Sequence, residues 1–177
     1  MNLNWKRITS LELGALISQS LRDNGFDSIL VGGACVSIYS ENKYISKDLD
    51  FVIYPPVKEI VSVLESLGFR LEFSNRFVRD DCPFYIEFLN YPVTIGSEII
   101  LDRFKIIKTP QGNLKILTPT DSVKDRLAAY YYWNDLQSLE QAILITKKKK
   151  IELKAVEQWS IKENNIDKFQ QFLKRIK

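Results

Sequence analysis

The chain has 177 residues and a formal net charge of +3, with 45% hydrophobic and 27% charged residues. This length and composition exclude a disordered or fibrous protein and indicate one globular domain with an extension. No apolar run reaches the roughly 18 to 20 residues of a membrane span, and no signal-peptide stretch follows the first residues. We therefore expect a cytoplasmic protein that has no membrane partner.

The chain has no histidine and only two cysteines, Cys35 and Cys82. This excludes Ser-His-Asp and Cys-His catalysis, and it also excludes a thiolate–imidazole zinc site. Acid–base or metal chemistry must then use carboxylates, lysines or tyrosines. We expect both thiols to be structural.

The first third of the chain predicts the order helix, strand, helix, strand. Thr9 and Glu12 form a capping box at the start of an apolar pattern with helical spacing. A buried strand then ends at Gly32-Gly33, and a second strand follows a short helix. The predicted segments are helices over 8–24 and 34–41 and strands over 28–31 and 49–54.

The middle of the chain is predicted to be mainly sheet. One helical stripe over 57–67 precedes several runs rich in strand-forming residues. A turn over 110–113 joins the last two runs as a hairpin. The predicted strands cover 69–73, 76–78, 84–89, 99–108 and 114–117.

The last third is predicted to be helical. Thr118, Pro119 and Asp121 give a cap residue, a proline at the first helical position and an acid at the third. We expect breaks at Asn134 and at the lysine run 147–150. The sequence thus predicts an α+β protein with a mixed β-sheet flanked by helices in residues 1–118 and a C-terminal helical region in residues 119–177.

Asp48 and Asp50 open the second predicted strand. Side chains two positions apart on a strand point to the same side, so these two carboxylates repel each other. A divalent cation between them relieves the repulsion, and oxygen-only ligation suits Mg²⁺ or Mn²⁺. Alternatively, the pair faces solvent at the start of the strand.

An apolar strand ending in Gly32 and Gly33 lies upstream, with Gly33 fifteen positions before Asp48. Glycines let the backbone approach a ligand closely, and the N–H groups at the following helix start favour phosphate oxygens. The order of apolar strand, Gly-Gly, short helix and strand with Asp48 and Asp50 resembles the nucleotidyltransferase superfamily of the polymerase-beta type. The resemblance implies that Gly32 and Gly33 contact the triphosphate of an NTP and that Asp48 and Asp50 hold Mg²⁺ or Mn²⁺.

Glu87 lies within the apolar run Phe84 to Leu89, where a charge is unusual. The superfamily usually has a third carboxylate on a later strand, so the resemblance implies that Glu87 is a third metal ligand or the base for the attacking hydroxyl. The family more often has Asp at this position. Alternatively, Glu87 is the polar-face residue of a half-exposed strand.

The nucleotide also needs cations that neutralise its triphosphate, and Lys47, Lys124 and Arg126 are the candidates. The helix that carries Lys124 and Arg126 is similar to the one after the catalytic domain in small bacterial nucleotidyltransferase-like proteins of the abortive-infection toxin/antitoxin type. The resemblance covers roughly Asp27 to Leu139. Alternatively, Lys124 is a helix-surface charge and Trp133 a core residue.

The C-terminal segment is basic. Residues 147–177 carry a net charge of +6, whereas residues 1–146 carry −3. The run Lys147 to Lys150 is a candidate contact for nucleic-acid phosphates, and Trp159 offers a ring for stacking. Alternatively, the run is a solvated face.

Together these patterns predict a Mg²⁺-dependent nucleotidyltransferase that moves an NMP from an NTP to a hydroxyl of an RNA, protein or small-molecule acceptor. One alternative is a nucleotidyltransferase-fold protein with impaired catalysis that serves as a nucleotide sensor or toxin–antitoxin partner. Another is an α/β protein without a nucleotide function.

Overall fold

The computed structural model describes residues 3–177. Its main element is a seven-stranded mixed sheet with the strand order β3-β4-β5-β2-β1-β9-β8, beside a two-stranded sheet of β6 and β7. β2 is antiparallel to β1 and parallel to β5, and β1 is parallel to β9. The strands are β1 (Ser28–Val31), β2 (Asp48–Ile53), β3 (Arg70–Phe73), β4 (Arg76–Val78), β5 (Tyr85–Asn90), β6 (Val93–Ile95), β7 (Glu98–Ile100), β8 (Phe104–Thr109) and β9 (Gly112–Leu117).

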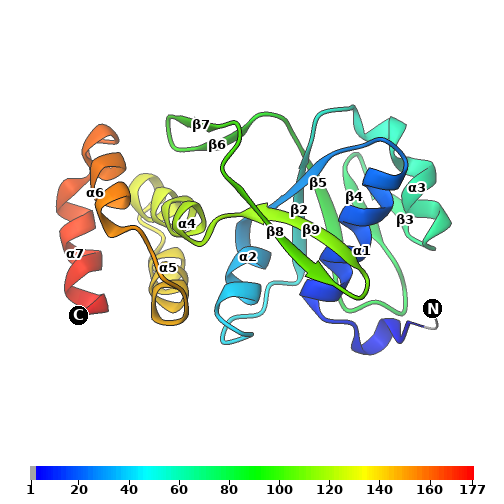
Figure 1. Ribbon diagram of the computed structural model, residues 1–177, viewed down its shortest axis with the longest axis horizontal. Coiled ribbons are helices and arrows are strands. Elements are labelled where there is room, and N and C mark those ends of the chain that lie inside the picture. The colour runs from blue at the N-terminus through cyan, green and yellow to red at the C-terminus, as the bar shows by residue number, and fades with distance from the viewer. Residues whose placement is uncertain (1–2) are drawn as a thin grey trace.

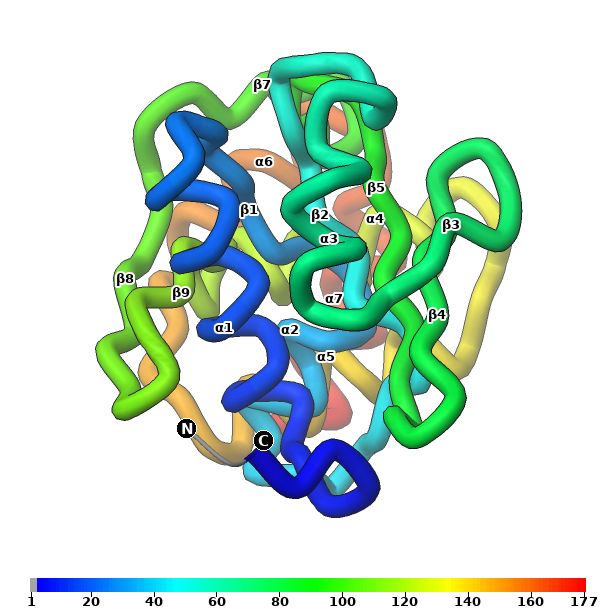
Figure 2. Tube along the Cα trace, turned by 90° about the vertical axis from the view of Figure 1, so that its right-hand side faces the viewer, coloured from blue at the N-terminus to red at the C-terminus, as the bar shows by residue number. Residues whose placement is uncertain are grey.

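Helices lie on both sides of the large sheet. α1 and α3 cover one side, whereas α4 to α7 form a bundle on the other, with α2 between the sheet and this bundle (Figures 1 and 2). The helices are α1 (Ser10–Asp23), α2 (Gly32–Tyr39), α3 (Val61–Ser66), α4 (Pro119–Trp133), α5 (Leu136–Lys148), α6 (Leu153–Lys162) and α7 (Ile166–Ile176), with short 3-10 turns η1 (Trp5–Arg7) and η2 (Val57–Glu59). The predicted α+β class, with a mixed sheet flanked by helices, is confirmed.

The helix ends follow the capping chemistry expected from the sequence. Thr9 and Glu12 form the complete capping box of α1. Thr118 accepts a hydrogen bond from the backbone N–H of Asp121 at the start of α4, where Pro119 is the first helical residue. Asn134 ends α4 in the left-handed conformation, with φ of 53°. Because α5 ends at Lys148, the predicted breaks at Asn134 and at the lysine run 147–150 are confirmed.

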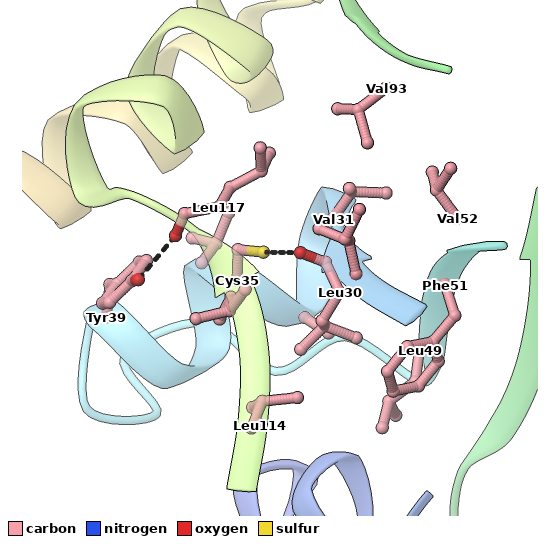
Figure 3. Close-up of a cluster of buried hydrophobic side chains, with 14 of the residues drawn as sticks. Leu30, Val31, Cys35, Tyr39, Leu49, Phe51, Val52, Val93, Leu114 and Leu117 are labelled. Carbon is pink, nitrogen blue, oxygen red and sulfur yellow. Dashed lines mark hydrogen bonds between the residues drawn. The ribbon is translucent and has the colours of Figure 1, made fainter. Parts of the chain in front are cut away.

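The core between the sheet and α2 is apolar and well connected. Figure 3 shows side chains of β1, α2, β2 and β9 packed together, including Leu30, Cys35 and Leu117. The hydroxyl of Tyr39 donates to the carbonyl oxygen of Leu117 at 2.6 Å, and the Cys35 thiol donates to that of Leu30 at 3.4 Å. Burial raises the pKa of the Cys35 thiol, which is therefore a neutral structural group. Cys82 is half-buried.

One predicted strand is wrong. Residues 99–108 do not form a single strand, because the chain turns between β7 and β8 at residues 101–103. Ile99 and Ile100 instead pair with Thr94 and Val93 in the β6–β7 hairpin, which the sequence analysis missed. Its three-residue strands are too short to give a periodic signal, and contacts with the distant helix α6 hold them in place.

Two tryptophan interpretations also change. Trp159 is 3% exposed, stacks on Tyr131 and donates its indole N–H to the carbonyl oxygen of Ile95, so its ring does not offer a stacking surface. Trp133 is 82% exposed and is not a core residue. Both rings lie on helices, and whether each ring is buried depends on contacts with distant segments that the local sequence does not show.

The sheet and the C-terminal helices meet at residue 118. β9 ends at Leu117 and α4 begins at Pro119, so this change of structure coincides with the predicted boundary. The division into domains over 1–118 and 119–177 stays a prediction. Within residues 3–177, every helix is too short or too polar to cross a bilayer.

Candidate functional site

Three predicted carboxylates share one face of β2 and β5. Asp48 and Asp50 alternate along β2 with the fully buried Leu49 and Phe51, and Asp50 lies directly opposite Glu87 on β5. Side chains on neighbouring strands at the same register point to the same face. The carboxylates therefore face away from the α1 and α3 side of the sheet and towards α4.

The electrostatics of Asp50 reflect this crowding. Burial, followed by the negative charges of Asp48 and Glu87, raises the pKa of Asp50 to about 7, while the positive charge of Arg126 acts in the opposite direction. An ionised Asp50 is thus unfavourable beside two like charges. Three carboxylates this close together favour the binding of a cation.

The glycine pair lies against these carboxylates. Gly32 has φ of 68°, and a Cβ atom at this position would be 2.5 Å from Oδ2 of Asp50. A Cβ at Gly33 would be 2.6 Å from Oγ of Ser46. The glycines are therefore required for the start of α2 to approach the carboxylates closely, and this helix start presents backbone N–H groups at the same place.

Ser46 is a site residue that the sequence analysis missed. It is 3% exposed, its backbone N–H donates to Oγ of Ser37 at 2.8 Å, and its hydroxyl donates to a carboxylate oxygen of Asp48. The hydrogen bond fixes the orientation of Asp48. Ser46 lies two positions before Asp48, and in an extended segment this spacing places both side chains on the same side. This spacing is the sequence signal for Ser46.

The donor set suits a hard divalent cation. Asp48 and Asp50 offer oxygen atoms only. A bound cation would offset the repulsion from Asp48 and Glu87, which adds to the effect of burial in raising the pKa of Asp50. Within residues 3–177, no three His, Cys, Asp or Glu side chains are arranged as a ready metal cage. The oxygen ligands of Asp48 and Asp50 suit Mg²⁺ or Mn²⁺, and metal ligation by Asp48, Asp50 and Glu87 stays a prediction.

Arg126 is the predicted cation whose positive charge acts on Asp50. Its guanidinium forms an ion pair with Asp125 at 2.6 Å and donates to Oε1 of Gln141 at 3.3 Å. Its charge also favours ionisation of Asp50. Arg126 is thus a half-buried positive group on α4 that faces the carboxylate site. Asp125 beside it is a second residue that the sequence analysis did not single out.

The other two predicted nucleotide-binding lysines lie in different surroundings. Lys124 is 3% exposed, and its ammonium pairs with Glu98 at 3.2 Å and Asp121 at 3.6 Å. It connects α4 with β7 and is not a surface charge. Lys47 is exposed immediately before Asp48, next to the start of β2.

The basic run lies at the end of α5. Lys148 and Lys149 pair with Glu41 at 2.9 and 3.2 Å, whereas Lys147 and Lys150 are exposed. The ion pairs connect the end of α5 with the turn that follows α2. A contact with nucleic acid through this run stays a prediction.

Comparisons with known proteins agree on the fold. No family model and no curated protein sequence matches the chain. Among solved structures, it is similar to the lincosamide antibiotic adenylyltransferase LnuA with lincomycin bound, at 11% identity and a TM-score of 0.54, covering 80% of this chain and 99% of that one. It is also similar to an antigenic nucleotidyltransferase-like protein from Paracoccidioides brasiliensis, at 12% identity and a TM-score of 0.51, covering 95% and 92%.

A third similar structure is that of ANT(2")-Ia in complex with adenylyl-2"-tobramycin, at 10% identity and a TM-score of 0.50, covering 92% of this chain and 97% of that one. At identities this low the likeness concerns the fold alone. The chain has the nucleotidyltransferase fold.

Proposed function

We propose that this protein is a nucleotidyltransferase that moves an NMP from an NTP to a hydroxyl group of a small-molecule acceptor. The observation that carries the proposal is the position of Asp48, Asp50 and Glu87 on one face of the sheet, against the Gly32-Gly33 start of α2. Two of the similar structures, named as an adenylyltransferase with lincomycin bound and a complex with an adenylylated tobramycin, support a small-molecule acceptor over RNA or protein.

In this proposal the backbone N–H groups at Gly32 and Gly33 orient the phosphates of the NTP. Asp48 and Asp50 would hold a divalent cation, which would supply charge neutralisation for the transferred phosphoryl group. The acceptor oxygen forms a bond to the α-phosphorus, and the bond to the bridging oxygen breaks so that pyrophosphate leaves with the electron pair. Glu87 takes the proton of the attacking hydroxyl.

The test is incubation of the protein with each α-labelled NTP and Mg²⁺, together with small-molecule, RNA or protein fractions of a cell extract. We expect label in a small-molecule product and release of pyrophosphate. Label in RNA or protein would replace the small-molecule acceptor, and an absence of label in all three fractions would contradict the proposal.

A second candidate function is nucleotide sensing or toxin–antitoxin partnership without turnover. The observation that favours it is the Arg126 guanidinium, whose charge offsets that of Asp50 without a metal ion. The Glu at position 87, where the family more often has Asp, points the same way. Calorimetric binding of NTP without pyrophosphate release across all acceptor fractions would support this function.

A further inference from the structure

The carboxylate face continues along β2 and β5 into an apolar and then an aromatic surface. Two residues beyond Asp50 and Glu87, the next pair on the same face is Val52 and Leu89. Just beyond the strand ends, Tyr54 and Tyr91 contact each other with ring centroids 5.8 Å apart. The tyrosines are 82% and 42% exposed and are therefore available to a ligand.

A pocket of about 170 Å³ opens at the apolar pair. Val93 of the β6–β7 hairpin and Asp125 of α4 also line it, so it lies between the sheet, the hairpin and the C-terminal helices. Figure 3 shows the side chains of Val31, Val52 and Val93 close to one another at this place. Six of its nine lining residues are apolar, and the other three are Asn90, Thr94 and Asp125.

The size and lining of the pocket indicate its ligand. An apolar cavity of about 150 Å³ in a protein core is known to hold one benzene molecule. Because most of this lining is apolar, the pocket favours one hydrocarbon ring over a sugar or a phosphate. Asp125 is already paired with Arg126, and its carboxylate does not require a cationic ligand.

The position of the pocket relative to Gly32 and Gly33 decides which substrate enters it. Ser46 lies beside Gly33 and binds Asp48, so the phosphate-binding end of the site is at the start of β2. In an in-line displacement the attacking oxygen and the leaving pyrophosphate lie on opposite sides of the α-phosphorus. The acceptor must then approach from the other end of the strand, where Val52 and Leu89 form the pocket.

We propose that this pocket, with the exposed Tyr54–Tyr91 pair at its edge, is the acceptor subsite and takes a small alcohol that carries one aromatic or alicyclic ring. The inference rests on the proposed function for the transfer step. The ring occupies the space at Leu89, and the hydroxyl points along β2 towards Asp50 and Glu87. The hydroxyl loses its proton to Glu87, its oxygen bonds to the α-phosphorus, and pyrophosphate leaves with the electron pair of the broken bond.

The experiment uses benzyl alcohol and cyclohexylmethanol as probes and glycerol as the polar control. Binding is measured by ligand-observed NMR on the full chain, with Leu89→Gln as the test variant and Leu71→Gln as its match. Leu89 and Leu71 are 39% and 41% exposed strand residues of the same sheet, so both variants should fold. We expect both ring probes to bind wild type and Leu71→Gln equally well. They should bind Leu89→Gln about five- to tenfold more weakly, because this variant loses an apolar contact.

Two other measurements separate the outcomes. Calorimetric binding of ATP with Mg²⁺ should be equal in Leu89→Gln and wild type; an equal loss of ATP and probe binding would place the nucleobase in the pocket and overturn the proposal. Displacement of benzyl alcohol by a single-stranded RNA oligonucleotide, with RNA binding lost in Leu89→Gln, would also overturn it. So would ring probes that bind all three proteins alike or none.

A pyrophosphate assay distinguishes a failure of the acceptor subsite from a failure of the proposed transfer reaction. Leu89-dependent probe binding without pyrophosphate release, for any of the four NTPs, would support the ring pocket and contradict the transfer reaction. The subsite alone would be contradicted by a different result with benzyl alcohol as the acceptor. In that result pyrophosphate release depends on Asp48 but is unchanged by Leu89→Gln.

Discussion

The two faces of β2 differ in what they contribute to the protein. On one face Leu49, Phe51 and Ile53 are at most 2% exposed and pack in the core. On the other, Asp48 and Asp50 crowd like charges beside Glu87. One set of alternate residues on this strand thus stabilises the fold. The other set forms a cluster of like charges that destabilises it, as expected for a site that binds a cation.

The largest effect is expected on the covered face. Phe51 is fully buried and stacks on Phe88 with ring centroids 6.0 Å apart. Phe51→Ala should lower the free energy of unfolding by about 3 to 5 kcal/mol, because it removes buried area and leaves a cavity. Urea unfolding followed by circular dichroism measures the change.

The matched control for Phe51→Ala is Phe73→Ala, since Phe73 lies in the same sheet but is 65% exposed. This control should change stability by no more than about 0.5 kcal/mol. Equal losses in the two variants would contradict the assignment of Phe51 to the core.

An intermediate effect on stability is expected at the contact between the β6–β7 hairpin and the end of α6. Glu163, just after α6, accepts hydrogen bonds from the backbone N–H of Ser97 at 3.0 Å, from the Ser97 hydroxyl at 2.6 Å and from Tyr132. Glu163→Ala should lower the unfolding free energy by about 2 kcal/mol, because these donors lose their partner. Glu157→Ala on α6 is the control, and an equal midpoint for the two variants in urea would argue against an anchor at Glu163.

A smaller effect of opposite sign is expected at the carboxylates. Asp50→Asn removes one of three neighbouring negative charges, so the metal-free protein should gain about 1 to 2 kcal/mol of stability. Mg²⁺ should raise the melting temperature of wild type and not that of the variant. The exposed Asp102→Asn is the control for an aspartate outside the site. A loss of stability in Asp50→Asn without metal would show that the carboxylate has a structural role.

The smallest effect is expected at the basic run. Lys148 and Lys149 pair with Glu41, whereas Lys147 and Lys150 are exposed. The double variant Lys147→Ala, Lys150→Ala should leave label transfer and the binding of an RNA oligonucleotide within about twofold of wild type, as is usual for solvated surface charges. Fluorescence anisotropy at two salt concentrations measures the binding. A tenfold weaker and less salt-dependent RNA complex would instead establish the nucleic-acid contact.

Local sequence signals predicted the elements that build the site. The apolar strand before Gly32-Gly33, the capping box at Thr9 and the proline start of α4 depend on residues within a few positions of each other. The alternation of Asp48 and Asp50 with buried residues likewise follows from the geometry of a single strand.

The rest depended on contacts between distant segments. Lys124 could be recognised as a buried ion-pair residue only once Glu98 was placed on the unpredicted hairpin. Trp159 is buried because the same hairpin covers it. The opposition of Asp50 and Glu87 required the parallel pairing of β2 with β5, which the sequence alone does not specify.

The most direct test of the account measures label transfer from α-labelled NTP with saturating Mg²⁺ and an acceptor fraction that supports turnover. Wild type, Asp48→Asn, Asp50→Asn and the Asp102→Asn control are compared at equal concentration. We predict that either site variant loses transfer by about 10³-fold or more while remaining folded, and that the control keeps wild-type activity. Undiminished transfer in Asp48→Asn and Asp50→Asn would contradict the central claim that these two carboxylates carry the chemistry.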